Sequence, residues 1–200
     1  MGKKVILIGG SPTVGKSTIA MKLASEYGYN CISTDDIGEV LQTVTDINPM
    51  KNMDYREYYI KKSIDELIND VEEYHSKIWP AIKRLIDIHS DWSTPIIIEG
   101  WALYPRLLKS VKADNMASIW LVGSSDLFRE RLIRKEKFYS GASHANLLID
   151  NYIKRSNWHN SKIKKELDDM EEEYIMVTKE LSIEKIFEKA SRILDIMGSS

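Results

Sequence analysis

Eight residues near the start of this chain, Gly10 to Ser17, have the types and spacing of a phosphate-binding loop. They read Gly-Ser-Pro-Thr-Val-Gly-Lys-Ser, lie between an apolar run and a helical pattern, and fit the motif G-x-x-x-x-G-K-[ST]. Glycine lets the backbone turn its N–H groups toward an anion, and the next helix points its positive dipole end at the same place. In this chemistry Lys16 neutralises the β- and γ-phosphates of ATP, and Ser17 offers a hydroxyl to Mg²⁺. The predicted nucleotide contacts are Gly10, Thr13, Val14, Gly15, Lys16, Ser17 and Thr18.

Acidic residues follow two of the predicted strands. Asp35 and Asp36 come after a strand over residues 30–33, and Glu99 lies near the end of an apolar run over residues 95–100. In a parallel sheet these strand ends point at the phosphate loop. Asp35 is predicted to accept the proton of an acceptor hydroxyl, with Asp36 as the alternative. The other interpretation of either residue is a simple helix cap. Glu99 is predicted to contact Mg²⁺ or the substrate, the other interpretation being a structural bond to the loop backbone.

A basic segment follows the fourth predicted strand. Arg131 and Arg134 are three residues apart, so they share one face of a predicted helix. Guanidinium groups that close over a transferring phosphoryl group stabilise its negative charge. Both arginines are therefore predicted to be catalytic, and Arg134 also to contact the nucleotide. Arg155, on the next predicted helix, can approach the phosphates from the other side of a lid. The alternative for the basic segment itself is a solvated helix face on which Glu130 and Glu136 alternate with the basic residues.

Four residues are weaker candidates for contact with the substrate. Trp101 stands two positions after Glu99, at the edge of the same site. Arg106 is nearby and can hold a phosphate or carboxylate of an acceptor, although a surface arginine fits its position equally well. The predicted substrate contacts are Asp36, Trp101, Arg106 and Arg155.

The elements that must position these residues alternate between strands and helices. Strands are predicted over residues 4–9, 30–33, 95–100, 117–122 and 174–178. Helices between them predict right-handed crossovers and a parallel sheet in one domain over residues 1–200. The helical stretch from Tyr55 to His89 is longer than a crossover needs, so residues 50–90 are predicted to form a cap, kinked or interrupted at Pro80. Residues 135–158 are predicted to form a lid.

The charge balance and the cysteine count limit the classes of binding partner that are expected. The chain has 28 Lys and Arg against 30 Asp and Glu, a formal net charge of −2, so neither nucleic acid nor a membrane is expected as a partner. The single cysteine, Cys31, excludes an internal disulfide and is expected to be buried in its strand. With no signal peptide in the first residues, a cytoplasmic protein is expected, either monomer or homodimer.

Together these segments resemble the small-molecule and nucleoside-monophosphate kinase branch of the phosphate-loop proteins. Within that branch, the loop, the T-D-x-I-x-E-V segment at residues 34–40 and the E-G-x-x-L-x-P segment at residues 99–105 most resemble 2-phosphoglycerate kinase. This resemblance implies a three-layer α/β P-loop fold with a five-stranded parallel sheet in the order 2-3-1-4-5, a helical cap and a lid. It also implies ATP-dependent phosphorylation of a hydroxyl on a small anionic metabolite.

The sequence thus predicts an ATP- and Mg²⁺-dependent kinase whose partner is a small-molecule acceptor such as a phosphoglycerate-like compound. Two alternatives stay open. A nucleoside or nucleotide kinase would hold a base under the cap. A regulatory module would bind ATP without transferring phosphate, but a static binder has little need of several arginines over the phosphates.

Overall fold

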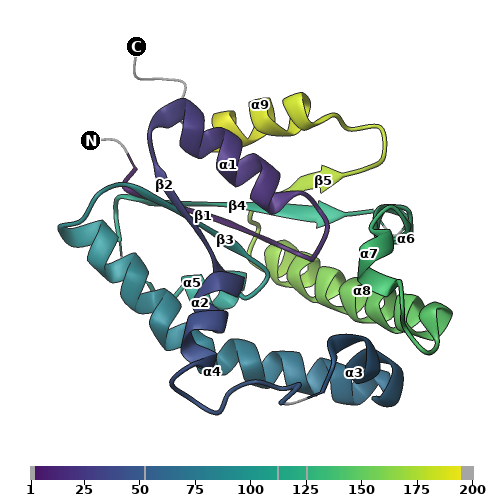
Figure 1. The fold of residues 1–200 in the computed structure, drawn as a ribbon. Helices are drawn as coiled ribbons and strands as arrows, with labels where there is room; N and C mark the ends of the chain where they lie inside the picture. Colours follow the sequence, from purple (N-terminus) through teal and green to yellow (C-terminus); the bar gives the residue numbers. More distant parts are fainter. Residues whose placement is uncertain (1–2, 52, 112, 125, 195–200) are drawn as a thin grey trace.

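Five parallel strands form one sheet in the order β2-β3-β1-β4-β5, as predicted, in a computed structural model that describes residues 3–194 except 52, 112 and 125 (Figure 1). The strands are β1 (Val5–Gly10), β2 (Asn30–Ser33), β3 (Ile96–Gly100), β4 (Met116–Gly123) and β5 (Ile175–Val177). The central strand β1 pairs with β3 in the register Ile8 to Glu99. This register brings the start of the phosphate-binding loop beside the carboxyl end of β3.

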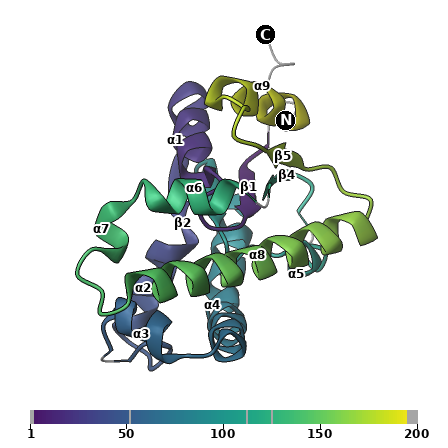
Figure 2. The same cartoon turned by 90° about the vertical axis from the view of Figure 1, so that its right-hand side faces the viewer.

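Helices cover both faces of the sheet, giving three layers. In Figures 1 and 2, α1 and α9 lie on one face, and α4, α5 and α8 lie on the other. Strand β1 is buried on both sides because Val5 and Leu7 pack toward α4 and α8 while Ile6 and Ile8 pack toward α1 and α9. The helices are α1 (Lys16–Tyr27), α2 (Thr34–Gln42), α3 (Tyr55–Lys61), α4 (Ile64–Asp91), α5 (Pro105–Leu108), α6 (Leu127–Ile133), α7 (Glu136–Tyr139), α8 (Ala145–Asp169) and α9 (Ile183–Ile193).

The helical stretch between β2 and β3 is interrupted at a different place from the one predicted. The break falls at Lys62 and Ser63, where Ser63 and Glu66 form a capping box that starts α4. Helix α4 then continues through Pro80 without interruption. A proline inside a helix costs about 3 kcal/mol, but Ile78 and Ile82 on either side of it are buried in the core. Of the two predicted outcomes, a kink or a break, the break at Pro80 is therefore wrong, because packing outweighs the local preference.

Cys31 is exposed, which corrects the expectation that it is buried. Strand β2 is the edge of the sheet and pairs only with β3. An edge strand has one open side, so an apolar pattern does not guarantee burial there. Among the described helices, none combines the length and the apolar character needed to cross a membrane.

A third apolar cluster lies away from the sheet, between α3 and α8. It contains the buried rings of Tyr58 and Tyr59, with Phe138 and Tyr152 packed against them. The side-chain amide of Asn151 on α8 donates to the carbonyl of Tyr59 at 2.8 Å, which ties α3 to α8. Helix α3, inside the predicted cap of residues 50–90, is therefore held beside α8 (Figure 2).

Candidate active site

The loop between β1 and α1 has the backbone conformation of an anion cradle. Gly15, which precedes α1, has φ 102°, and Thr13 has φ 66°, a value that non-glycine residues rarely adopt. Such positive-φ residues let successive N–H groups point to one side. The Thr13 hydroxyl is buried and has no hydrogen-bond partner among the residues that the structure describes. An unsatisfied donor and a strained residue at this loop are what a phosphate-binding site predicts.

Lys16 is folded back over the loop. Its Nζ donates to the carbonyl of Ser11 at 2.8 Å, and its side chain is only 7% exposed. Burial lowers the pKa of Lys16 to about 8, although the charges of Glu99 and Asp35 act in the opposite direction. The buried ammonium group lacks a direct ion pair within 4 Å in the described part of the chain. A phosphate chain in the loop would supply the missing negative charge.

Ser17 and Glu99 meet at the base of the loop. The Ser17 hydroxyl donates to Glu99 Oε1 at 2.8 Å, and Glu99 is buried. A hydroxyl and a carboxylate are the hard oxygen donors that suit Mg²⁺, which completes its shell with phosphate oxygens and water. The oxygen donors of this pair fit Mg²⁺ that arrives with a nucleotide. No cluster of three or more His, Cys, Asp or Glu that could hold a metal occurs among the described residues.

Asp35 is held at the start of α2, where Ser33 caps the helix by accepting from its N–H. The indole Nε1–H of Trp101 donates to Asp35 Oδ1 at 2.8 Å. Trp101 follows β3, and Gly100 before it leaves room for Thr34, since a Cβ at Gly100 would lie 1.7 Å from the Thr34 hydroxyl. This close approach brings the ends of β2 and β3 together. Asp35 and Trp101, predicted from distant parts of the sequence, are thus in contact.

A buried histidine that sequence reasoning did not select connects these parts. The side chain of His159 on α8 is 0% exposed; its Nδ1 lies 3.0 Å from Ser11 Oγ, and its Nε2 lies 2.8 Å from the carbonyl of Trp101. Burial lowers the pKa of His159 to about 3, so the ring is neutral. A neutral ring with one proton must donate from Nε2 to Trp101 and accept from the Ser11 hydroxyl. His159 thereby joins the phosphate-binding loop to the residue that holds Asp35.

A signal for His159 did exist in the sequence. Asn151, Arg155 and His159 recur every four residues, which places them on one face of α8, and all three are buried. Polar residues on a buried helix face require partners or a function. This polar face points toward the loop and the cap rather than toward solvent.

The arginines singled out from the sequence have different environments. Arg131 Nη1 donates to the carbonyl of Thr13 at 2.7 Å, so it contacts the phosphate-binding loop. Arg134 has a side chain 75% exposed and pairs with Glu130 on its own helix. Arg106 pairs with Asp169 at the far end of α8. Arg131 is therefore assembled with the loop, whereas the other two lie outside the cluster of contacts around it.

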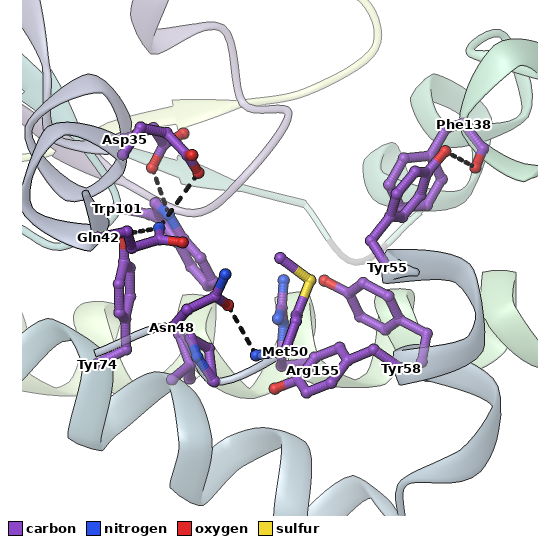
Figure 3. A pocket seen from close by; sticks show the side chains of 14 residues that line it. Asp35, Gln42, Asn48, Met50, Tyr55, Tyr58, Tyr74, Trp101, Phe138 and Arg155 are labelled. Atoms are coloured by element: carbon purple, nitrogen blue, oxygen red, sulfur yellow. Dashed lines mark hydrogen bonds between the residues drawn. The ribbon is translucent and has the colours of Figure 1, made fainter. Parts of the chain in front are cut away.

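A cavity of about 320 Å³ opens beside Asp35, between the predicted cap and α8 (Figure 3). Asp35, Trp101 and Arg155 all line it. Asp36 is exposed in the first turn of α2 and is not among the lining residues. Six of the fourteen residues that line the cavity are aromatic: Tyr55, Tyr58, Tyr59, Tyr74, Trp101 and Phe138. Asp35, whose charge acts on Lys16 of the phosphate-binding loop, is thus exposed to this cavity, which has the position of an acceptor site.

The fold and the loop together define a P-loop kinase-like protein. A sugar kinase structure from a Janibacter species shares this fold with a TM-score of 0.59, at 17% identity, over 97% of this chain and 95% of that one. A family model described as isopentenyl transferase matches residues 3–185, so the chain belongs to this family. The motifs in the sequence did not predict that family.

The resemblance to 2-phosphoglycerate kinase is confirmed. The enzyme of that name from Methanocaldococcus jannaschii is 29% identical over 156 residues, 75% of this chain and 50% of that protein. A tRNA dimethylallyltransferase from Saccharomyces cerevisiae is 26% identical over 122 residues, 59% of this chain and 28% of that protein. The chain therefore spans about half, or less, of the length of these two curated relatives.

Proposed function

We propose that this chain is a phosphotransferase that moves the γ-phosphoryl group of ATP, with Mg²⁺, to a hydroxyl of a small anionic molecule. One observation carries the proposal: Lys16, the Ser17–Glu99 pair and Asp35 share one edge of the sheet, beside a cavity large enough for a small acceptor. The similarity to 2-phosphoglycerate kinases supports the same class of reaction. Phosphoryl transfer depends on positioning and charge neutralisation, which these groups can supply.

Each residue has a role in this proposal. The loop amides and Lys16 hold the phosphate chain, and Ser17 with Glu99 would hold Mg²⁺, which neutralises phosphate charge when bound. Asp35 accepts a hydrogen bond from the acceptor hydroxyl and takes its proton as the bond to phosphorus forms. Arg131, already in contact with Thr13 of the loop, would be placed to reach bound phosphates, while Arg134 would need to leave Glu130 to reach them.

ADP release tests this function. Purified protein is incubated with Mg-ATP and a panel of hydroxylated acceptors: phosphorylated sugars, glycerates, nucleosides, nucleotides and aromatic hydroxy acids. Lys16→Ala provides the blank, because it removes the charge that holds the phosphates. We expect ADP release that depends on one class of acceptor and is absent from the blank. Tight ATP binding with no acceptor-dependent release from any class would instead indicate a regulatory nucleotide-binding module.

Prenyl transfer is a second candidate, favoured by the family match over residues 3–185. The phosphate-binding loop would then hold the diphosphate of a prenyl donor, and Asp35 would take a proton from an acceptor amine or hydroxyl. The formal net charge of −2 gives no electrostatic support for a large nucleic-acid acceptor. Incubation with dimethylallyl diphosphate and the same acceptors distinguishes the two reactions, because prenyl transfer releases diphosphate and needs no ATP.

A further inference from the structure

The cavity beside Asp35 has walls that suit a ring. Trp101 and Tyr74 line one part of it, and Tyr55, Tyr58 and Met50 line another part (Figure 3). Aromatic side chains interact with a flat ligand by offset stacking or edge-to-face contact, and each such pair stabilises beyond simple burial. A phosphoglycerate, by contrast, carries a polar group on each of its three carbons and has no apolar surface to place against these rings. These aromatic lining residues, called the aromatic wall below, therefore favour a planar, partly apolar ligand.

The charges of the cavity favour a single anionic group. Of its lining residues in the described part of the chain, Arg155 is the one cation, against the carboxylates of Asp35 and Glu39. Its side chain is 7% exposed and forms no ion pair within 4 Å with any described carboxylate. The Nε atom of Arg155 is buried without a hydrogen-bond partner. A buried guanidinium without a carboxylate partner is a site for an anion.

Aromatic rings hold this guanidinium in place. Arg155 Cζ lies 4.6 Å from the centre of the Trp101 ring and 4.7 Å from that of Tyr59. These cation–π contacts fix the plane of the guanidinium but satisfy none of its N–H donors. The same indole that lies against Arg155 donates its N–H to Asp35. The anion site and the proton acceptor are therefore separated by about one aromatic ring.

We propose that the acceptor is a ring-bearing molecule with one anionic group, a carboxylate or a phosphate monoester, and a hydroxyl close to that group. This inference rests on the proposed phosphotransferase function and names its acceptor class. The anion binds Arg155, the ring lies against the aromatic wall, and the hydroxyl reaches Asp35. A phosphoglycerate is a poor fit, because its two anionic groups would face one guanidinium and two carboxylates.

Calorimetric binding to the full chain, without ATP, tests the inference separately from catalysis. Four ligands are compared: an aromatic hydroxy acid, its neutral amide, a nucleoside monophosphate and 2-phosphoglycerate. We expect the aromatic acid, the nucleoside monophosphate, or both to bind at least tenfold more tightly than 2-phosphoglycerate and the neutral amide. The preferred one of the two identifies the anion as carboxylate or phosphate. Equal or tighter binding of 2-phosphoglycerate, or no binding of either ring-bearing anion, overturns the proposal.

Variants locate the binding site. Arg155→Gln should weaken binding of the ring-bearing anion at least tenfold and leave the weak binding of the neutral amide unchanged. The matched control Arg106→Gln removes an exposed arginine outside the cavity and should change neither. Tyr74→Leu leaves Arg155 intact and should weaken the ring-bearing ligands but not 2-phosphoglycerate, which keeps the test valid if Arg155→Gln does not fold. Unchanged affinity for the ring-bearing anions in Tyr74→Leu, or in a folded Arg155→Gln, contradicts the assignment.

The two proposals fail in different ways. If ring-bearing anions bind as expected but cause no ADP release from ATP, the phosphotransferase function is wrong and the ligand site remains. If ADP release requires an acceptor without a ring, the acceptor class is wrong and the function remains.

Discussion

The proposed nucleotide side and the proposed acceptor side of this site are built in different ways. The nucleotide side is one continuous segment, Gly10 to Ser17, whose function depends mainly on backbone conformation. The acceptor side is assembled from α2, α3, α4, the residues after β3, and α8, and depends on side chains. One fold can carry different functions, so the side chains around the cavity, and not the fold, have to identify the acceptor. The comparison teaches that a local motif in the sequence indicates the nucleotide, whereas the acceptor has to be inferred from packing.

The largest expected effect separates catalysis from nucleotide binding. Asp35→Asn removes the proton acceptor but not the loop, so phosphoryl transfer should fall by about 10²- to 10⁴-fold, while the Kd for ATP stays constant. Single-turnover transfer and calorimetric ATP binding measure the two quantities. Asp36→Asn is the matched control and should retain the parent rate, because Asp36 does not line the cavity. The reverse outcome would make Asp36 the base.

A variant of Glu99 tests whether this residue contributes to Mg²⁺ binding. Glu99→Gln keeps the size of the side chain and can still accept from Ser17, but it removes the negative charge. The Mg²⁺ concentration that gives half-maximal transfer should rise by about 10- to 100-fold. Titration of Mg²⁺ at saturating ATP measures this change. An unchanged Mg²⁺ requirement would mean that Glu99 contributes only to the structure of the loop.

Lys16 gives the nucleotide side a pH dependence. Because burial lowers its pKa to about 8, the ammonium group loses its proton above pH 8 and no longer attracts phosphate. The affinity for ATP should therefore fall by up to about tenfold per pH unit between pH 8 and 9.5. Lys16→Arg keeps the charge at these pH values, so its ATP affinity, even if weaker, should not change with pH. Wild-type affinity that is constant to pH 9.5 would contradict the lowered pKa.

His159, which lies between Ser11 of the loop and Trp101 of the cavity, should make the stability of the fold decrease at acid pH. Its pKa is about 3 in the folded chain and near 6.5 in the unfolded chain, so below pH 6.5 the unfolded state binds a proton that the folded state does not. The contribution of His159 to the free energy of unfolding is therefore fully present above pH 6.5. Below pH 6.5 the free energy of unfolding falls by up to about 1.4 kcal/mol per pH unit. His75, whose pKa is also well below its usual value because of burial, adds to this loss.

Urea unfolding between pH 7 and 5 measures the effect of His159. His159→Gln should reduce the slope of the unfolding free energy against pH by about one bound proton, leaving the contribution of His75. Identical slopes in the two proteins would show that His159 is accessible to protons in the folded state.

The sequence predicted what local patterns and strand order determine. The loop follows from a motif of neighbouring residues, and Asp35 and Glu99 follow from the rule that parallel strand ends converge. The contacts of Arg155 and His159 depend on how α8 packs against the cap, which residues far apart in the sequence decide. The course of α4 through Pro80 and the exposure of Cys31 also depend on packing and on strand position. Local sequence propensity contains no information about packing or about the position of a strand in the sheet.

The proposed transfer of a phosphoryl group is tested most directly by ³¹P NMR of the wild-type chain with Mg-ATP and a ring-bearing hydroxy anion. We predict that the γ-phosphate signal of ATP is replaced by signals of ADP and of a new phosphate ester, and that this ester forms far more slowly with Asp35→Asn and with Lys16→Ala. Formation of inorganic phosphate without an ester, or product formation only from a prenyl diphosphate, would contradict this account.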